Sequence, residues 1–392
     1  MVTDAYPPMR TSCAVQMYDL GQAFIEEGHQ VTLITPVSAL KEKISISLED
    51  SVRLVQVKTF KTKDVNYVYR TFAEFVNPFL IWYKLKKAPE FLGTQYDGII
   101  WYSPTIFWGP LIKRLKQLFE VKAYLILRDI FPDWIFHLGI IKKGLIFSFF
   151  KTIEKFQYLQ ADTIGVQSPN NLKYFKEKNQ GLRADVEVLW NWIGRVKESP
   201  YSLDLSKTHM AGRSIFIYAG NIGVAQGSVR LLATAIALEK NHKVGFLVLG
   251  RGVEIDQLRL DIKINNLTNV LILDEIRPDE LNYVFGQCSA GIVTLDHRHQ
   301  SHNIPGKFLS YIRSNLPVLA ILNQDNDLFE MISENNLGIA VDGSLITDFS
   351  KSVISLSKFI EDKLFDAERA SNLMQTFFSP KSKVAQIIQA LH

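Results

Sequence analysis

The stretch Asn-Ile-Pro-Gly-Lys-Phe-Leu-Ser at residues 303–310 combines a glycine and a lysine at the start of a helical pattern. Free backbone N–H groups at a helix N-terminus favour an anion, and a glycine lets a ligand approach the backbone closely. We therefore predict that Pro305, Gly306 and Lys307 bind a diphosphate, although the GxxxxGK[ST] pattern of a P-loop is missing. Ser310 lies one turn further and could reach a ribose hydroxyl. A hydrogen bond to its own helix backbone is the alternative.

Two other segments repeat the combination of glycine with a predicted strand end. Gly220 and Asn221 follow the apolar run 214–219, and Arg251 lies between two glycines, the second of them Gly252, after the run 244–249. An arginine offers a fork of N–H donors that fits phosphate. Glycines in turns are common and a surface arginine in a turn is ordinary, so these loops support the anion site without proving it.

The first half of the chain has its own polar residues before a helical pattern. Arg10, Thr11 and Ser12 precede an amphipathic segment, and Ser103 ends the apolar run 99–103. A helix N-terminus again favours an anion, while plain capping by Ser12 is the alternative. Arg10 has no capping role, so it indicates a binding site more strongly than Thr11 or Ser12 does.

Charged residues follow a third apolar run, 123–127. Arg128 and Asp129 come directly after it, and Asp133 follows a short turn later. Charged side chains are poor core material, so Asp129 is a functional candidate. For Asp133 we keep open a role in turn formation or helix capping.

No metal site is expected. His297, His299 and His302 cluster in one segment, but their spacing fits no zinc pattern and no cysteine accompanies them. The chain also lacks GxSxG, HExxH and a first-strand GxGxxG, which disfavours hydrolases, zinc proteases and dinucleotide oxidoreductases.

These residues need elements that place them at the same edge of a sheet. Short apolar runs alternate with helical segments over 1–196, which is typical of parallel βαβ units, and a second such series covers 213–378. A turn-rich linker over 197–212 separates them. We predict an α/β fold of two doubly wound, Rossmann-like domains that face each other across a cleft. The last helix, over 379–392, is expected to pack back on the first domain. The opening run Met-Val-Thr is short for a strand, and we expect its natural start upstream.

The composition of the chain indicates which classes of partner are compatible with it. Residues 1–196 hold 25 Lys and Arg residues against 19 Asp and Glu residues. This basic, aromatic-rich half is compatible with nucleic acid or an anionic lipid surface, or it has an ordinary solvated surface. The segments 72–92 and 140–159 mix aromatic residues with lysines, as interfacial helices do, although core packing is the alternative. Two distant cysteines favour a reducing cytoplasm, and no run is apolar enough to span a membrane.

The motifs YPPMRTS, YAGNIG, VLGRG and PGKFLSYIRSNLPVLA, in this order, resemble bacterial family-4 glycosyltransferases of the GT-B fold. The segments RTSCAVQMYDL, WYSPTIFWGPL and LILRDIFPDW are closer still to O-antigen N-acetyl-L-fucosamine transferases. The resemblance covers essentially the whole chain.

That resemblance implies a metal-independent, retaining transfer of an N-acetyl-deoxyhexosamine, N-acetyl-L-fucosamine in the first place, from a UDP-sugar to a lipid-linked saccharide in O-antigen or capsule biosynthesis. The second domain would bind the donor and the first the acceptor. The enzyme would need no cofactor and no nucleic acid, and would work in the cytoplasm on the anionic inner face of the cell membrane. The implied donor residues are Gly220, Asn221, Arg251, Gly252, Pro305, Gly306, Lys307 and Ser310. On the acceptor side the residues are Arg10, Thr11, Ser12 and Ser103, and the catalytic candidates are Arg128, Asp129 and His302.

Two pairs of residues depart from the family pattern. The usual glutamate pair falls on His302 and Ser310, and the usual basic pair falls on Asn221 and Gln226. Arg251 and Lys307 would then supply the positive charge. Two alternatives therefore stay open: a UDP-sugar epimerase, and a catalytically silent partner of another glycosyltransferase that binds UDP or lipid.

Overall fold

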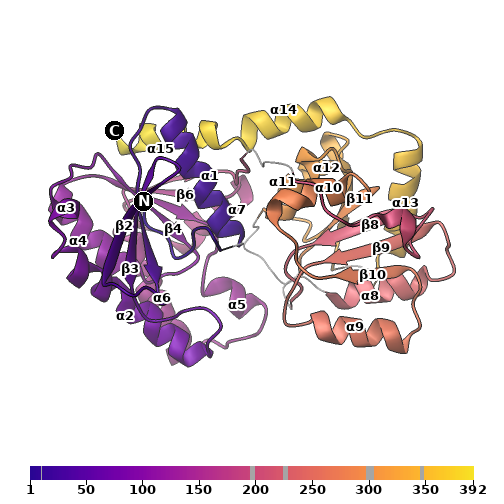
Figure 1. The fold of residues 1–392 in the computed structure, drawn as a ribbon, viewed down its shortest axis with the longest axis horizontal. Coiled ribbons are helices and arrows are strands. Elements are labelled where there is room, and N and C mark those ends of the chain that lie inside the picture. The colour runs from indigo at the N-terminus through magenta and orange to yellow at the C-terminus, as the bar shows by residue number, and fades with distance from the viewer. Residues whose placement is uncertain (10, 195–198, 224–227, 297–303, 345–347) are drawn as a thin grey trace. The chain divides into compact units, whose positions relative to one another are not determined.

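The computed structural model describes residues 1–9, 11–194, 199–223, 228–296, 304–344 and 348–392 (Figure 1). It divides into two compact units. Unit 1 comprises Met1–Gly194 and Ser379–His392, and unit 2 comprises Arg195–Phe378. The predicted domain boundary at residue 196 lies close to Gly194.

Unit 1 contains two sets of strands, and the first residues of the chain lie between them. The strands β4 (Ile99–Ser103), β5 (Ala123–Leu127), β6 (Thr163–Val166) and β7 (Asp185–Val188) pair in the order β4-β5-β6-β7. A second sheet has the order β1-β3-β2, with β1 at Thr32–Val37, β2 at Ile44–Glu49 and β3 at Val52–Lys58. Val2 bridges Ile34 of β1 on one side and Trp101 of β4 on the other. The short opening run therefore occupies the centre of the unit.

Helices cover both faces of this arrangement. The core on one face joins side chains of α2 (Tyr67–Leu85), α3 (Pro89–Leu92), α4 (Gly109–Phe119), α6 (Leu145–Tyr158) and α7 (Pro169–Lys178) to the sheet. The other face is covered by α1 (Ser12–Glu26) and by the last helix, α15 (Pro380–Leu391), while α5 (Asp133–His137) follows β5. The alternating burial of apolar residues on opposite strand faces explains these two cores.

The hairpin of β2 and β3 is a feature that the sequence analysis did not identify. These strands are antiparallel, and their two-residue turn, Asp50 and Ser51, has φ of 46° and 66°. A turn with positive φ at both positions matches the twist of a hairpin. The alternation of Ile44, Ile46 and Leu48 with polar residues was the available signal.

Unit 2 contains one parallel sheet of six strands in the order β10-β9-β8-β11-β12-β13. The strands are β8 (Ser214–Ala219), β9 (Val244–Leu249), β10 (Val270–Leu273), β11 (Ala290–Thr294), β12 (Val318–Leu322) and β13 (Gly338–Asp342). Numbered along the chain this order is 3-2-1-4-5-6, the doubly wound order of Rossmann folds. The order reverses between β8 and β11.

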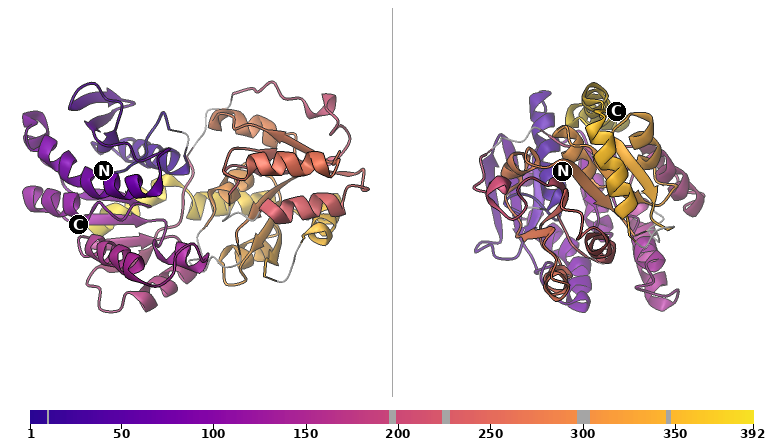
Figure 2. Two further views of the ribbon diagram at one scale, coloured as in Figure 1. Left: turned by 90° about the horizontal axis from the view of Figure 1, so that it is seen from below. Right: turned by 90° about the vertical axis from the view of Figure 1, so that its right-hand side faces the viewer.

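The helices of unit 2 also lie on both faces of the sheet (Figure 2). The core on one face includes α8 (Ser228–Ala237), α9 (Ile255–Ile264) and α13 (Ser350–Glu361). The remaining helices are α10 (Leu281–Phe285), α11 (Gly306–Arg313), α12 (Leu328–Glu334) and α14 (Ala367–Phe377), with short 3-10 turns at Leu205–Lys207 and Pro278–Glu280. Through α14 and α15, yellow in Figure 1, the chain passes from unit 2 back to unit 1.

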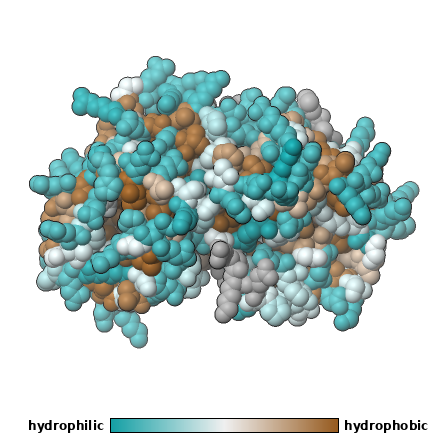
Figure 3. Space-filling model, turned by 90° about the horizontal axis from the view of Figure 1, so that it is seen from above, coloured by the Kyte–Doolittle hydropathy of each residue, from teal (hydrophilic) through white to brown (hydrophobic). Residues whose placement is uncertain are grey.

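The surface mixes polar and apolar regions. On the face shown in Figure 3, hydrophobic residues reach the surface as separate patches among hydrophilic ones. Within the residues that the structure describes, no helix is both long and apolar enough to cross a bilayer.

Candidate functional site

The switch between β8 and β11 in unit 2 defines the first candidate site. Ligands of doubly wound sheets bind outside the carboxyl ends of the strands at the point where the strand order reverses. The segment after β8 contains Gly220 and Asn221, and α11, which follows β11, contains Lys307. The structure therefore brings the two sequence motifs to the same edge of one sheet.

The loops after β8 and β9 lie against each other as an extension of the two strands. The N–H of Gly220 donates to the carbonyl of Leu249 at 2.8 Å, and the N–H of Ile222 donates to the carbonyl of Arg251 at 2.8 Å. A side chain at position 252 would place its Cβ 2.0 Å from the carbonyl oxygen of Ile222. Gly252 is thus required by the contact between the loops, whatever its contact with a ligand.

Lys307 reaches from α11 to the end of β8. Its Nζ lies 4.8 Å from the ring centroid of Tyr218, and a Cβ on Gly220 would come within 3.3 Å of that Nζ. Within the described residues no carboxylate pairs with this ammonium group. Desolvation lowers the pKa of Lys307 to about 8. A cation held at a switch point without an internal counter-charge is suited to bind an anionic ligand.

Tyr311 fixes α11 in this position. Its hydroxyl accepts from the N–H of Ala219 at 2.9 Å and donates to the carbonyl of Ile217 at 3.2 Å. Gly291 of β11 makes room for the ring, because a Cβ there would approach it to 2.3 Å. Neither residue was found from the sequence. The one available signal was the placement of Tyr311 four residues after Lys307, on the same helix face.

The other predicted donor residues have different environments. Arg251 is exposed and forms an ion pair with Glu275 at 3.0 Å. The Ser310 hydroxyl donates to the carbonyl of Gly306 at 3.3 Å, which is the helix-internal alternative considered for it. The carbonyl of Asn221 accepts from the Tyr218 hydroxyl at 2.8 Å.

Pro305 caps α11, and Gly306 begins the helix. The described part of the chain leaves open space where a side chain at position 306 would lie, and its φ is not positive. The fold described here therefore does not itself require glycine at that position, whereas a ligand close to the backbone would.

The carboxyl edge of the unit 1 sheet holds the predicted acceptor-side residues. The Thr11 hydroxyl, and not that of Ser12, caps α1 by accepting from the N–H of Ala14 at 3.3 Å. Ser103 at the end of β4 is fully buried, and its hydroxyl has no hydrogen-bond partner within the described residues. Arg10 and His302 lie outside the described residues, as do His297, His299 and Gln226.

Arg128 is buried inside unit 1 and does not extend into solvent. Its guanidinium lies 4.4 Å from the ring centroid of Trp192 and 5.9 Å from that of Tyr102, and Nη1 donates to the carbonyl of Leu189 at 3.1 Å. Nε and Nη2 are buried without a hydrogen-bond partner among the described residues. Burial lowers the pKa of Arg128.

A network of buried amides surrounds Arg128. Tyr102 donates to Gln16 Oε1 at 2.6 Å, and Gln16 Nε2 donates to Asn191 Oδ1 at 3.1 Å. Asn191 Nδ2 donates in turn to Gln167 Oε1 at 3.1 Å, and Gln167 donates to the carbonyl of Arg128. Satisfied networks of this kind hold one arrangement rigidly. No sequence pattern pointed to these amides.

Asp129 and Asp133 have different surroundings. Asp129 is only partly buried at the carboxyl end of β5. Asp133, the first residue of α5, is buried and pairs with Lys151 at 3.2 Å, and it accepts from the Tyr174 hydroxyl at 3.2 Å. The neighbouring Glu154 also pairs with Lys151, and burial raises its pKa to about 7. Asp133 therefore has a structural role that its turn position alone did not indicate.

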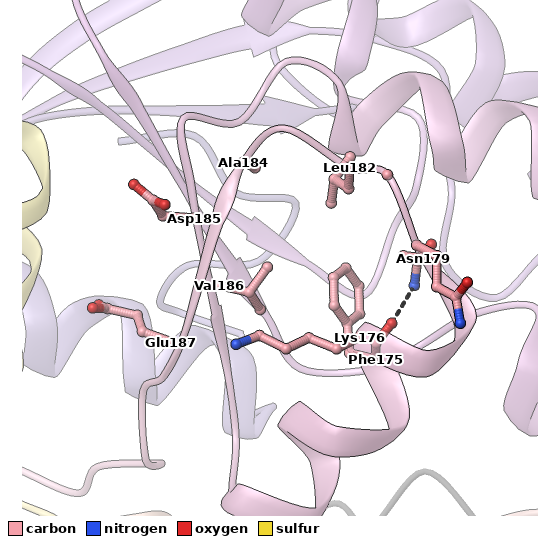
Figure 4. Close-up of a pocket in the computed structure, with 10 residues that line it drawn as sticks. Phe175, Lys176, Asn179, Leu182, Ala184, Asp185, Val186 and Glu187 are labelled. Carbon is pink, nitrogen blue, oxygen red and sulfur yellow. Dashed lines mark hydrogen bonds between the residues drawn. The ribbon is translucent and has the colours of Figure 1, made fainter.

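A surface pocket of about 380 Å³ lies between the end of α7 and the edge strand β7 (Figure 4). Phe175, Leu182 and Val186 form its apolar wall, and Lys176 and Glu187 lie at its side. The Glu187 carboxylate is already held by the Tyr124 hydroxyl at 2.7 Å. None of the predicted site residues lines this pocket.

Within the residues that the structure describes, no group of three His, Cys, Asp or Glu side chains is arranged to hold a metal ion.

Comparison with known proteins identifies the fold. No family model and no curated protein matches the sequence. Among solved structures, the chain is similar to sucrose-phosphate synthase from Thermosynechococcus elongatus, with a TM-score of 0.72 and 12% identity over 99% of this chain and 97% of that one. WaaG, a glycosyltransferase involved in lipopolysaccharide biosynthesis, has a TM-score of 0.62 at 12% identity, with 99% of each chain covered.

A third similar structure is HepE from Anabaena in complex with UDP and glucose, with a TM-score of 0.65 and 13% identity over 100% of this chain and 98% of that one. The similarity spans both units, and the strand order of unit 2 is the doubly wound order. The predicted fold class is confirmed: the chain has the α/β GT-B fold of these glycosyltransferases.

Proposed function

We propose that this chain is a retaining glycosyltransferase that moves an N-acetyl-deoxyhexosamine, N-acetyl-L-fucosamine in the first place, from a UDP-sugar to a lipid-linked saccharide in O-antigen or capsule biosynthesis. The observation that carries the proposal is Lys307: a desolvated ammonium group with no counter-charge among the residues that the structure describes, beside Gly220 at the strand-order switch of unit 2.

On the donor side, a diphosphate next to Lys307 would supply the missing negative charge. Phosphate oxygens would also meet the free N–H groups at the start of α11, where Gly306 leaves the backbone accessible. Arg251 could join by exchanging its exposed partner Glu275 for phosphate, which costs little because surface ion pairs are weak.

These fixed cations and amides suit a reaction without a metal. As the bond between sugar and diphosphate breaks, negative charge grows on the leaving group, and groups already oriented toward it stabilise that charge. In a retaining transfer, the acceptor hydroxyl would attack from the side of the leaving group, so the proposal needs no protein nucleophile.

On the acceptor side, the proposal assigns the saccharide to the carboxyl edge of unit 1. Asp129 is a partly exposed carboxylate there and is proposed to orient or deprotonate the acceptor hydroxyl. Arg128, held by Trp192 and Leu189, would act as its rigid neighbour and not as a direct contact. A lipid-linked acceptor implies work at the anionic inner face of the cell membrane.

Two similar structures support the same class of reaction. WaaG is described as acting in lipopolysaccharide biosynthesis, and HepE was solved with UDP and glucose. At 12% to 13% identity these proteins do not identify the sugar or the acceptor of this chain.

The proposal is tested with purified protein, a panel of UDP-amino-sugars that includes UDP-N-acetyl-L-fucosamine, and a synthetic lipid-diphospho-N-acetylglucosamine, followed by mass spectrometry of the lipid product. We expect product from one donor, formed equally with and without a chelator, with the anomeric configuration of the donor kept. A donor altered without acceptor would instead indicate an epimerase. UDP binding without any product across the panel would indicate a silent partner, and either result would overturn the proposal.

A further inference from the structure

The outward face of α2 is aromatic, which reverses the usual pattern of a surface helix. Its side chains at i, i+4, i+7, i+11 and i+15 from position 68 point to solvent: Val68 is 83% exposed, Phe72 55%, Phe75 45%, Phe79 40% and Tyr83 52%. The opposite face, with Ala73, Asn77, Ile81 and Leu85, is buried against the unit. Core packing, the alternative considered for the segment 72–92, explains Phe91 and the partly buried Trp82, but not the exposed rings of this outward face.

Cations flank this aromatic face. Lys86 and Lys87 lie over the Tyr83 ring, with Nζ 5.3 Å and 4.1 Å from its centroid. From the neighbouring α4, the Arg114 guanidinium lies 6.0 Å from the centroid of Phe79 and 5.9 Å from that of Trp82.

The charge around α2 is strongly one-sided. Residues 58–87 contain seven Lys and Arg residues and two acidic residues. One of the two, Glu74, is already neutralised by Arg70 at 2.7 Å. The surface is therefore both apolar and positive, a combination that a purely apolar protein interface does not need.

The aromatic contacts continue toward α6. Phe75 packs against Phe107 with centroids 6.3 Å apart, and Phe107 packs against Phe150 of α6 at 6.5 Å. At the start of α6, Leu145 is 91% exposed and Ile146 66%, directly after two lysines at 142 and 143. The helices α2, α4 and α6 contact one another in sequence, so these groups belong to one side of unit 1 (Figure 1).

We propose that this side of unit 1 is a docking surface for an anionic lipid bilayer, with α2 lying in the plane of the interface. The rings of Phe72, Phe75 and Phe79 would enter the boundary between headgroups and acyl chains, and Lys86, Lys87 and Arg114 would contact lipid phosphates. Charge complementarity selects this occupant, because the rings carry cations on their rim and few carboxylates.

Docking through α2 would also position the carboxyl edge of the unit 1 sheet, to which we assign the acceptor. The Thr105 hydroxyl, in the segment after β4, donates to Glu74 of α2 at 2.9 Å, and Phe107 of the same segment packs on Phe75. The membrane-bound helix would thus hold the carboxyl edge of the unit 1 sheet next to the lipid surface. This inference deepens the proposed function by naming the face that meets the membrane, but its test requires no turnover.

The test is cosedimentation of the full-length protein with phosphatidylcholine vesicles that do or do not contain phosphatidylglycerol. We expect binding only with the anionic lipid, weakened by salt. The double variant Phe72→Ser/Phe79→Ser should lower the partition coefficient at least about tenfold, because it removes two inserting rings. Lys86→Glu/Lys87→Glu should lower it severalfold.

The matched control is Val253→Ser/Ile264→Ser, which removes two apolar side chains of unit 2 that are more exposed than Phe72 and Phe79, and it should leave vesicle binding unchanged. All these sites are solvent-exposed, and unchanged thermal unfolding would verify that each variant folds. The proposal is overturned if the wild type ignores anionic vesicles, or if the double Phe variant binds them as the wild type does. A dimer in solution that the same variant abolishes would assign the surface to a second copy of the chain. Vesicle binding is measured without turnover, so a protein that transferred no sugar would still give a valid result in this test.

Discussion

Lys307 in unit 2 and Arg128 in unit 1 are both desolvated cations next to an aromatic ring, yet the protein holds them differently. Arg128 lies 4.4 Å from Trp192, donates to Leu189 and is enclosed by a network of amides. Lys307 lies 4.8 Å from Tyr218 and has no hydrogen-bond partner among the described residues. Arg128 has one side-chain hydrogen bond and two aromatic contacts, although its Nε and Nη2 lack a partner among the described residues, whereas Lys307 has no hydrogen bond there and keeps its charge available to a ligand. We therefore assign ligand binding to Lys307 and positioning to Arg128.

The largest effect is expected at the residue next to Arg128. Asp129→Asn should lower turnover about 100-fold or more, because a positioned general base contributes about that much. UDP affinity should stay unchanged, since Asp129 belongs to unit 1. Initial rates at saturating donor, with calorimetric UDP titration alongside, measure both quantities. A loss of UDP affinity with turnover intact would remove Asp129 from the acceptor side.

Lys307→Met should weaken UDP binding about 10-fold to 100-fold, the worth of one or two charge-assisted hydrogen bonds. It should not lower the free energy of unfolding, because the folded protein holds this charge at a cost in desolvation. Calorimetric titration with UDP and urea unfolding provide the two values, and Lys263→Met, an exposed lysine of α9, is the control. Equal UDP affinity of Lys307→Met and wild type would show that the anion binds elsewhere.

Arg128→Met should lower the stability of the fold and leave UDP binding unchanged, the reverse of what we expect for Lys307→Met. It removes the hydrogen bond to Leu189 and the contact with Trp192, so we expect the free energy of unfolding to fall by about 1–2 kcal/mol. UDP affinity should not change. Urea unfolding checks the first effect, with the exposed Arg183→Met as control. If this variant proved as stable as wild type, the network would not be the rigid support that we describe.

The pH dependence of UDP binding separates the two cations further. Since the pKa of Lys307 is lowered to about 8, the free protein loses this charge as the pH rises through 8, and UDP affinity should fall with it, by up to about tenfold per pH unit. Below pH 8 the charged form also destabilises the folded state, and that destabilisation is relieved as the pH rises further. Lys307→Arg should bind UDP with a flat profile between about pH 7 and 9, because arginine stays protonated. A falling profile in the arginine variant would assign the titration to another group.

The smallest loss of UDP affinity that we expect is where α11 is attached. Tyr311→Phe leaves the N–H of Ala219 and the carbonyl of Ile217 without their buried partner, which should cost about 1–2 kcal/mol of unfolding free energy and lower UDP affinity severalfold. The exposed Tyr283→Phe, on α10, serves as control in the same unfolding and titration experiments. An unaltered UDP affinity would mean that α11 keeps its position without this hydroxyl.

Much of the fold was accessible from the sequence because parallel strands buried on both faces form continuous apolar runs, such as 244–249 and 318–322. The β2–β3 hairpin was not predicted because polar and apolar residues alternate along its strands, which are only partly buried and therefore form no continuous apolar run. Lys307 and Gly306 could be predicted as site residues because glycine and lysine at a helix start have few purely structural uses.

The support of the site was not predictable in the same way. Trp192 meets Arg128, and Gln16 meets Trp192, only through packing between segments far apart in the chain, and Tyr311 reaches β8 across the sheet. Gly252 illustrates the reverse problem: its residue type suggested a ligand, while the structure gives it a packing reason.

Hydrogen–deuterium exchange with and without UDP locates the nucleotide without any substitution. We predict slower exchange at residues 219–223, 250–254 and 306–311 of unit 2, and unchanged exchange at Arg128 and its neighbours in unit 1. Protection confined to unit 1, or saturating UDP with no protection of these three segments, would contradict the assignment of Lys307 to the donor site.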